Sequence, residues 1–397
     1  MSSNNPSSPG YLCAFDRVKE ATNSIGTGNL MLLGAVEKYV TFSSVYPLFD
    51  LVPYVCVHDS EDEWEVGLGT LNFLNFYTIA RERVIASSNN GSLVDFSAGT
   101  KTIFATAPSV ILNRGVPTTN EFRLSVSFTA VSTSDVQTSN WLFLLPYTGN
   151  TIALHNGVCW QTVSADIASY PPASASIQLN GLTADTNYDV FAYAVPAQIG
   201  NSLTVALELA AWQSDVLRAT LGIQDGQLVK DGDPTRRYIG TIRTISATET
   251  CDTAQRRFVY NAYNRVRRKL MVIEPDATWD YSDDTWRQVN ANADNQIEVV
   301  TGLDYDVVAL MANGRVTSSA SGQQAAVGIG IDSDTVNSAD LFDTVTVKSD
   351  LVLNPHATLL ANQLGYAKYV LLEQGAGADV QSWFSDDACG LVGHMMG

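Results

Sequence analysis

Six basic side chains that could bind anions lie between positions 256 and 269 of this 397-residue chain. A guanidinium group forms paired, charge-assisted hydrogen bonds with carboxylates and phosphates, so these arginines could bind an acidic protein or an acidic polysaccharide. The alternative is pairing with carboxylates of the chain itself, which the excess of 41 Asp and Glu over 23 Lys and Arg favours. The same two interpretations apply to Arg236 and Arg237. The candidate partner-binding residues are Arg256, Arg257, Arg267 and Arg268.

Aromatic rings alternate with acids in the segment WDYSDDTW at positions 279–286. Such a composition suits stacking on sugar rings, so Trp279, Tyr281 and Trp286 are candidate surface-binding aromatics. The alternative is ordinary packing of alternating aromatics within strands, and this alternative is the favoured one.

Carboxylates also occur in close pairs, at Glu63/Glu65, Asp283/Asp284 and Asp304/Asp306. A glycoside hydrolase needs two carboxylates roughly 5–10 Å apart on either side of a sugar. Sequence neighbours in turns are more often the solvated ends of strands, so we predict no catalytic residue and no enzyme activity.

Acidic residues in the segment DSDTVNSAD suggest a calcium site, because hard cations prefer clustered carboxylates. The segment lacks the spacing and the distal Glu of an EF-hand, which favours a polar loop over a site formed by Asp332, Asp334 and Asp340. No glycine-rich loop resembles a nucleotide cradle. We therefore predict neither a metal nor a cofactor.

Composition limits the fold class and the partners. Hydrophobic residues make up 45% and charged residues 16% of the chain, and this low charge favours strands over exposed helices. The formal net charge of −18 disfavours nucleic acid and anionic membrane surfaces. No apolar run is long enough for a spanning helix, so no membrane insertion is expected. Five scattered cysteines suggest synthesis in a reducing cytoplasm, and the prediction is an all-β protein.

Strand and turn signals divide the chain into regions. We expect a disordered N-terminus at 1–10, a small β domain at 11–112, a central β domain at 113–245 and a C-terminal β-sandwich at 246–397. The last two alternatively form one domain. One amphipathic helix is expected at about 253–270, with Asp252 as its cap and the arginines opposite its apolar stripe. Leu179, Leu182, Thr186 and Tyr188 resemble the tyrosine corner of fibronectin type III domains.

The N-terminal region resembles a module at the start of many tailed-phage tail and fibre proteins. One departure is Pro47–Pro53, where the family usually has a Gly- and Asp-rich turn. The matching blocks are Asp16–Glu20 (DRVKE), Gly26–Val36 (GTGNLMLLGAV), Trp64–Thr70 (WEVGLGT) and Ser87–Thr106 (SSNNGSLVDFSAGTKTIFAT).

The remainder resembles a second phage virion family of minor-tail or head-decoration type. Together the two resemblances imply a homotrimeric virion component, made in the host cytoplasm, whose partners are other virion proteins and a host-surface polysaccharide or protein. The function so implied is that of a tail fibre or spike in host attachment. The alternative is a capsid decoration, head-fibre or tail protein that binds only other virion proteins. The matching blocks are Pro146–Gly157, Leu179–Tyr193, Ala206–Trp212, Val229–Thr244, Arg256–Arg265, Trp286–Gln288, Val327–Ser333 and Gly390–Gly397.

Overall fold

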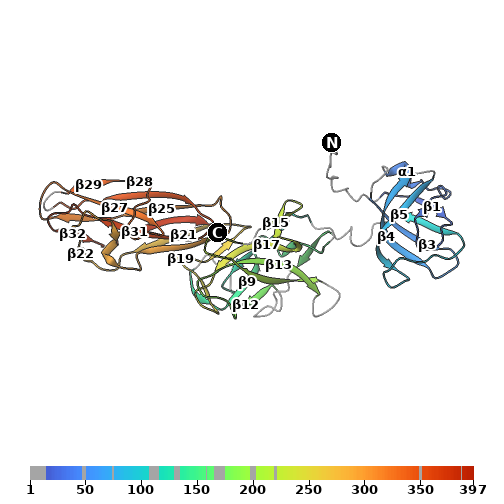
Figure 1. Ribbon diagram of the computed structural model, residues 1–397, viewed down its shortest axis with the longest axis horizontal. Coiled ribbons are helices and arrows are strands. Elements are labelled where there is room, and N and C mark those ends of the chain that lie inside the picture. The colour runs from blue at the N-terminus through green and yellow to red at the C-terminus, as the bar shows by residue number, and fades with distance from the viewer. Residues whose placement is uncertain are drawn as a thin grey trace. The chain divides into compact units, whose positions relative to one another are not determined.

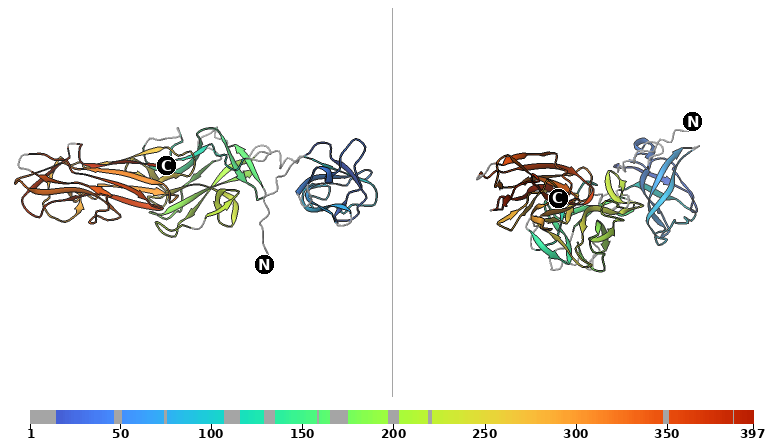
Figure 2. Two further views of the ribbon diagram at one scale, coloured as in Figure 1. Left: turned by 90° about the horizontal axis from the view of Figure 1, so that it is seen from above. Right: turned by 60° about the vertical axis from the view of Figure 1, so that its left-hand side comes forward.

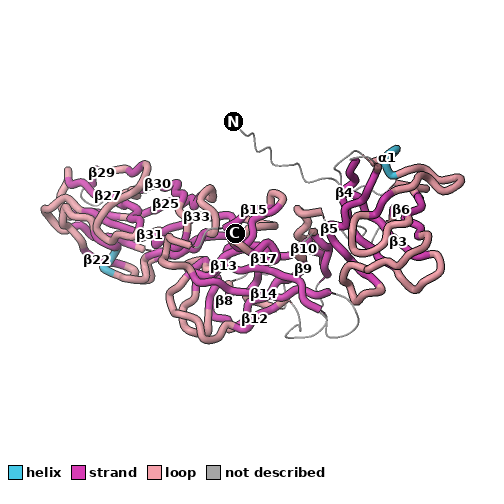
Figure 3. The backbone as a smooth tube through the Cα atoms, turned by 45° about the vertical axis from the view of Figure 1, so that its right-hand side comes forward, coloured by secondary structure: helices cyan, strands magenta, loops and turns pink. Residues whose placement is uncertain are grey.

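The computed structural model of the chain consists almost entirely of β-strands, which confirms the all-β prediction (Figures 1 and 3). Among the described residues the helical elements are α1 (Phe42–Val45) and a single 3-10 turn, η1 (Val289–Ala291). No helix in these residues is long and apolar enough to cross a bilayer. The prediction of a disordered segment at 1–10 lies outside the described residues, which are 15–46, 51–73, 76–106, 116–128, 135–157, 159–164, 175–196, 203–218, 221–347, 351–385 and 387–397.

The chain divides into two compact units, Met1–Arg114 and Gly115–Gly397. In the second unit, strands from both sides of position 246 pair directly. The strand at Val136–Ser139 pairs with the one at Thr250–Asp252, and the strand at Asp233–Arg243 pairs with the one at Val259–Asn261.

The first unit is a six-stranded antiparallel sheet that curls into a nearly closed barrel, with the order β1-β6-β3-β4-β5-β2. The chain just after β2 returns to β1, where the Leu33 N–H donates to the Ala21 carbonyl (3.0 Å). Alternate residues of β3 fill the interior, since Val52, Tyr54 and Cys56 are all fully buried. The strands are β1 (Lys19–Thr22), β2 (Leu30–Met31), β3 (Leu51–His58), β4 (Trp64–Phe73), β5 (Tyr77–Ser87) and β6 (Lys101–Ala105).

The second unit begins with three sheets around one apolar core. The hydroxyl of Tyr188 accepts a hydrogen bond from the Thr183 N–H (2.8 Å), which confirms the expected tyrosine corner. The sheets are β12 (Ser176–Gln178), β9 (Trp141–Pro146) and β7 (Phe122–Ser125); β10 (Thr151–His155) and β11 (Trp160–Ser164); and β14 (Leu203–Ala211), β13 (Asn187–Pro196), β17 (Asp233–Arg243), β16 (Gln227–Lys230) and β15 (Leu221–Gln224), with β20 (Val259–Asn261) on β17.

The rest of the second unit is a β-sandwich, drawn mostly in orange and red in Figures 1 and 2. Its core contains side chains from both large sheets, such as Val299 and Tyr369 from one and Leu310 and Leu359 from the other. The first sheet is β29 (Thr344–Val347), β27 (Gln323–Ile331), β31 (Gly365–Gln374), β24 (Gln296–Thr301), β19 (Arg256–Arg257), β18 (Thr250–Asp252) and β8 (Val136–Ser139), with β23 (Arg287–Gln288) on β31.

Two further sheets complete this sandwich. The five-stranded sheet is antiparallel throughout, and its central strand is β25. The two sheets are β21 (Arg267–Ile273), β33 (Gly390–Met396), β25 (Val307–Asn313), β30 (His356–Asn362) and β28 (Leu341–Phe342); and β22 (Thr278–Asp280), β32 (Gln381–Phe384) and β26 (Val316–Ser318).

The predicted helix at 253–270 is wrong, because this segment forms the strands β19, β20 and β21. Phe258, Val259 and Tyr260 are buried in succession, so the segment is covered on both faces and has no single apolar stripe. A turn with Asn264 at a φ of 50° separates β20 from β21. Pairing with β24, β17 and β33 therefore overrides the local helical spacing.

Candidate interaction surfaces

Two of the four candidate arginines are buried and bind the same carboxylate. A guanidinium nitrogen of Arg268 lies 2.9 Å from one carboxylate oxygen of Asp252, and one of Arg257 lies 3.3 Å from the other. Arg257 also contacts Asp135 (3.0 Å) and donates to the Lys269 carbonyl (3.0 Å). Arg257 and Arg268 are thus structural and not available to an external partner, which corrects their assignment as partner-binding residues.

The other two candidate arginines face outward but do not form a patch with the first two. Arg256 is half-exposed and pairs with Glu298 at 3.1 Å. Arg267 is exposed on β21, beside the Nδ1 of His394 (3.1 Å). Three of the four arginines, Arg256, Arg257 and Arg268, therefore form ion pairs with acids of the chain itself, as the favoured alternative predicted.

The candidate aromatics mostly pack inside the sandwich. Trp279 and Tyr281 are each 8% exposed, and Trp279 stacks on Trp383 with ring centroids 6.5 Å apart. Trp286 is partly buried, and its ring packs in a T-shaped arrangement with the ring of Phe342, with ring centroids 5.8 Å apart. Core packing is the correct interpretation for Trp279 and Tyr281, and their assignment to a binding surface is wrong.

A buried carboxylate, which the sequence analysis missed, organises these rings. Glu373 is fully buried in β31 and accepts hydrogen bonds from Trp279 Nε1 (2.7 Å), Arg287 Nε (2.9 Å) and the Asn290 N–H (2.9 Å). Burial raises the pKa of Glu373, against the effect of these donors. The single acid in the apolar run YVLLEQ was the available signal, because a lone carboxylate in such a run must find partners when it is buried.

Three of the paired carboxylates bind other groups of the chain. Glu65 is fully buried within the barrel of the first unit, whereas Glu63 lies outside β4 and accepts from the Ser97 N–H (2.9 Å). Asp306 binds Arg265 and Tyr260. These contacts join each of the three carboxylates to other residues of its own unit.

The acidic loop after β27 uses two of its carboxylates to bind backbone groups of the neighbouring strands β31 and β30. Asp332 accepts from the Lys368 N–H (2.8 Å), and Asp340 accepts from the Leu360 N–H (2.7 Å). No group of three or more potential metal ligands occurs in the part of the chain that the structure describes.

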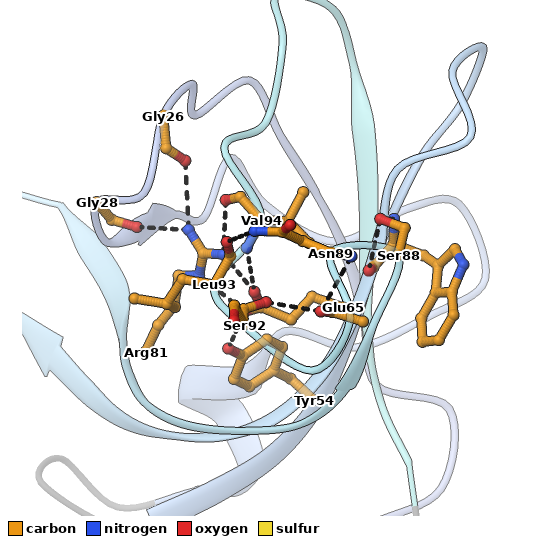
Figure 4. A network of polar contacts seen from close by, with 12 residues as sticks. Gly26, Gly28, Tyr54, Glu65, Arg81, Ser88, Asn89, Ser92, Leu93 and Val94 are labelled. Carbon is orange, nitrogen blue, oxygen red and sulfur yellow. Dashed lines mark hydrogen bonds and ion pairs between the residues drawn. The ribbon is translucent and has the colours of Figure 1, made fainter.

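Figure 4 shows the buried ion pair that Glu65 forms with Arg81. The Nε of Arg81 donates to Glu65 at 2.8 Å, and the Tyr54 hydroxyl and the Val94 N–H donate to the same carboxylate at 2.6 and 2.9 Å. The guanidinium also donates to the carbonyls of Gly26 and Gly28. Burial alone would raise the pKa of Glu65. The hydrogen bonds that its carboxylate accepts from Arg81, Tyr54 and Val94 outweigh burial and lower that pKa below 4.5.

An apolar surface, which the sequence analysis also missed, covers the outer face of the five-stranded sheet. Its strands lie side by side, with β25, β30 and β33 labelled in Figure 3. Outward-facing residues in such a sheet are usually polar, yet here they include Met311 (45% exposed), Leu360 (66%) and Leu341 (72%). The available signal was the unbroken apolar run VVALMA at 307–312, which has hydrophobic residues on both faces.

Comparisons with known proteins place no family name on the chain. No protein-family model matches it, and no curated protein sequence matches it. Among solved structures, infectious bursal disease virus Gt strain matches with a TM-score of 0.26 and 8% identity over 95% of this chain and 71% of that one. The insecticidal delta-endotoxin Cry8Ea1 from Bacillus thuringiensis matches with a TM-score of 0.20 and 9% identity over 76% of this chain and 56% of that one. Likeness at this level carries no argument about the fold or function of this chain.

Proposed function

We propose that this chain is a structural protein of a bacteriophage virion, and that it serves as a trimeric tail-fibre or spike component. In this proposal residues 11–112 attach the chain to the particle, and the rest trimerises and presents a surface to the host cell. The observation that carries the proposal is the ordered set of four sequence blocks in the first unit that resemble a phage tail and fibre module.

The contacts between these blocks support their interpretation as one module. Arg81 lies outside all four blocks, yet its guanidinium contacts three of them, through Gly26 and Gly28, Glu65 and Val94. Gly26 and Gly28 thus contact, across more than fifty positions, the guanidinium that forms the buried ion pair with Glu65. Such a shared centre gives a physical reason for the blocks to occur together.

The structural roles of the charged residues also agree with a protein that works by contact. Glu65, Asp252 and Glu373 are buried and bound to arginines or backbone groups of their own unit. Each of these three carboxylates therefore has partners within the fold, which supports the proposal of a structural protein.

Two measurements test the proposal. Mass spectrometry of gradient-purified phage should find the chain in the particle, and its absence there would overturn the proposal. Fluorescently labelled full-length protein should then bind susceptible bacteria and not resistant mutants that lack the surface receptor. Binding to particles without any binding to cells would instead support the alternative, a decoration or tail protein whose partners are other virion proteins.

A further inference from the structure

The outer face of the five-stranded sheet presents a row of side chains across all five strands that is apolar except for one threonine. The strand registers place Met271 of β21 beside Val392 of β33, then Met311 of β25, Thr358 of β30 and Leu341 of β28. Four of these five side chains are apolar, and Val392, Met311 and Leu341 are 39%, 45% and 72% exposed.

Neighbouring positions extend this apolar row along the strands. Leu360 is 66% exposed, and Val307, Met396 and Ile273 are 42%, 41% and 37% exposed. Contiguous apolar patches of this kind on soluble proteins mark interaction sites, whereas scattered hydrophobic residues do not. We call this surface, formed by β21, β33, β25, β30 and β28, the outer face.

The two edges of the outer face carry opposite charges. On the β21 edge, Arg267 and Lys269 are exposed and point to the outer face, as Met271 does. On the β28 edge, Asp340 is exposed, and the side chain of Asp343 is 63% exposed beside His356. The outer face thus has an apolar centre, a basic edge and an acidic edge.

We infer that the outer face is a self-association interface, whose occupant is a second copy of this chain. Two such faces that meet about an axis parallel to β25 place the β21 edge of one copy against the β28 edge of the next. Met311 then meets its own counterpart, and Met271 lies opposite Leu341 of the second copy. The same pairing of edges arises when three copies surround one axis. The inference therefore names the interface of the proposed trimer, and it rests on that proposal.

The outer face approaches the size of one side of a standard protein interface. Four strands of seven residues and the two-residue β28, about 4.8 Å apart with about 3.4 Å per residue, give a projected area of roughly 500 Å². Each partner in a standard protein interface contributes about 800 Å² of accessible surface. Opposite charges at the two edges would fix the orientation of the copies, since like charges brought together oppose association.

The first test replaces the centre of the outer face in the full-length chain. Sedimentation velocity should show the wild-type chain as a dimer or trimer at micromolar concentration. Met311→Lys should raise the dissociation constant by about a hundredfold or more, because a desolvated charge would face its own counterpart. Ile223→Lys is the matched control, since Ile223 is 74% exposed on β15 and lies outside the outer face. It should leave the oligomer unchanged.

The second test reverses the edge charges and keeps the fold. Arg267→Glu with Lys269→Glu should weaken association about tenfold at low salt, and so should Asp340→Asn with Asp343→Lys. Asn at position 340 retains an acceptor for the Leu360 N–H. All four substitutions in one chain make the β21 edge acidic and the β28 edge basic, and should restore association. Circular dichroism and thermal unfolding confirm that each variant is folded.

A wild-type chain that stays monomeric at about 100 μM would overturn the inference. An oligomer that Met311→Lys leaves intact would overturn it as well. Failure to restore association by exchanging the edges would also overturn the charge pairing. These measurements use buffer alone, so they are independent of particle and cell binding. A chain found in the virion but monomeric in solution would refute the inference and leave the virion proposal standing.

Discussion

Arg81 and Glu65 form an ion pair with side chains that are 2% and 0% exposed. Removal of one member of a buried pair leaves an uncompensated charge, which costs about 3–5 kcal/mol. We therefore predict that Arg81→Met lowers the free energy of unfolding of the first unit by this amount, measured by urea denaturation. Glu37→Gln is the control, because its ion pair with Lys38 is 3.9 Å long and largely exposed. A loss below about 1 kcal/mol in Arg81→Met would contradict the prediction.

The lowered pKa of Glu65 makes a second prediction about pH. A carboxylate whose folded-state pKa lies below its unfolded value of 4.5 stabilises the fold above that value. This stability is lost as the pH falls through the folded-state pKa. The free energy of unfolding of the first unit should therefore fall more between pH 7 and pH 3 in wild type than in Glu65→Gln. An equal difference in the two proteins would show that the ionised form of Glu65 does not stabilise the barrel.

At the scale of single elements, Asp252 joins β18 to β19 and β21 through Arg257 and Arg268. Asp252→Asn leaves two buried guanidinium groups facing a neutral side chain, and we expect a loss of about 3–5 kcal/mol in the unfolding of the second unit. Arg267→Gln on the exposed side of β21 should change stability by less than about 0.5 kcal/mol. Chemical denaturation compares the two variants, and equal losses would refute the distinction between buried and exposed arginines.

The tyrosine corner was predictable from the sequence, and the strands within 253–270 were not. The sequence analysis found the buried tyrosine corner and its Tyr188, because turn residues and alternating apolar residues are local signals. The segment 253–270 also has local helical spacing, but β19 pairs with β24 and β21 pairs with β33, and both partners lie far along the chain. Local periodicity contains no information about such long-range partners.

At the scale of the whole molecule, the two units have separate apolar cores, one within the first 105 residues and others beyond position 121. Because units with their own cores can unfold separately, we predict two calorimetric transitions for the chain. Glu65→Gln should lower the midpoint of one transition, and Asp252→Asn that of the other. One cooperative transition that both variants shift equally would contradict the prediction.

Composition and strand patterning by themselves determined the all-β class, since low charge and short apolar runs bounded by turn residues are properties of the sequence alone. Tertiary structure decided the direction of each side chain. In the basic cluster, Arg268 turns inward to Asp252, whereas its neighbour Arg267 turns outward. Successive residues of a strand point to opposite faces, so the roles of adjacent arginines depend on which face the rest of the sandwich covers. The outer face itself was unpredictable for the same reason, because a strand that is apolar on both faces does not reveal which face remains exposed.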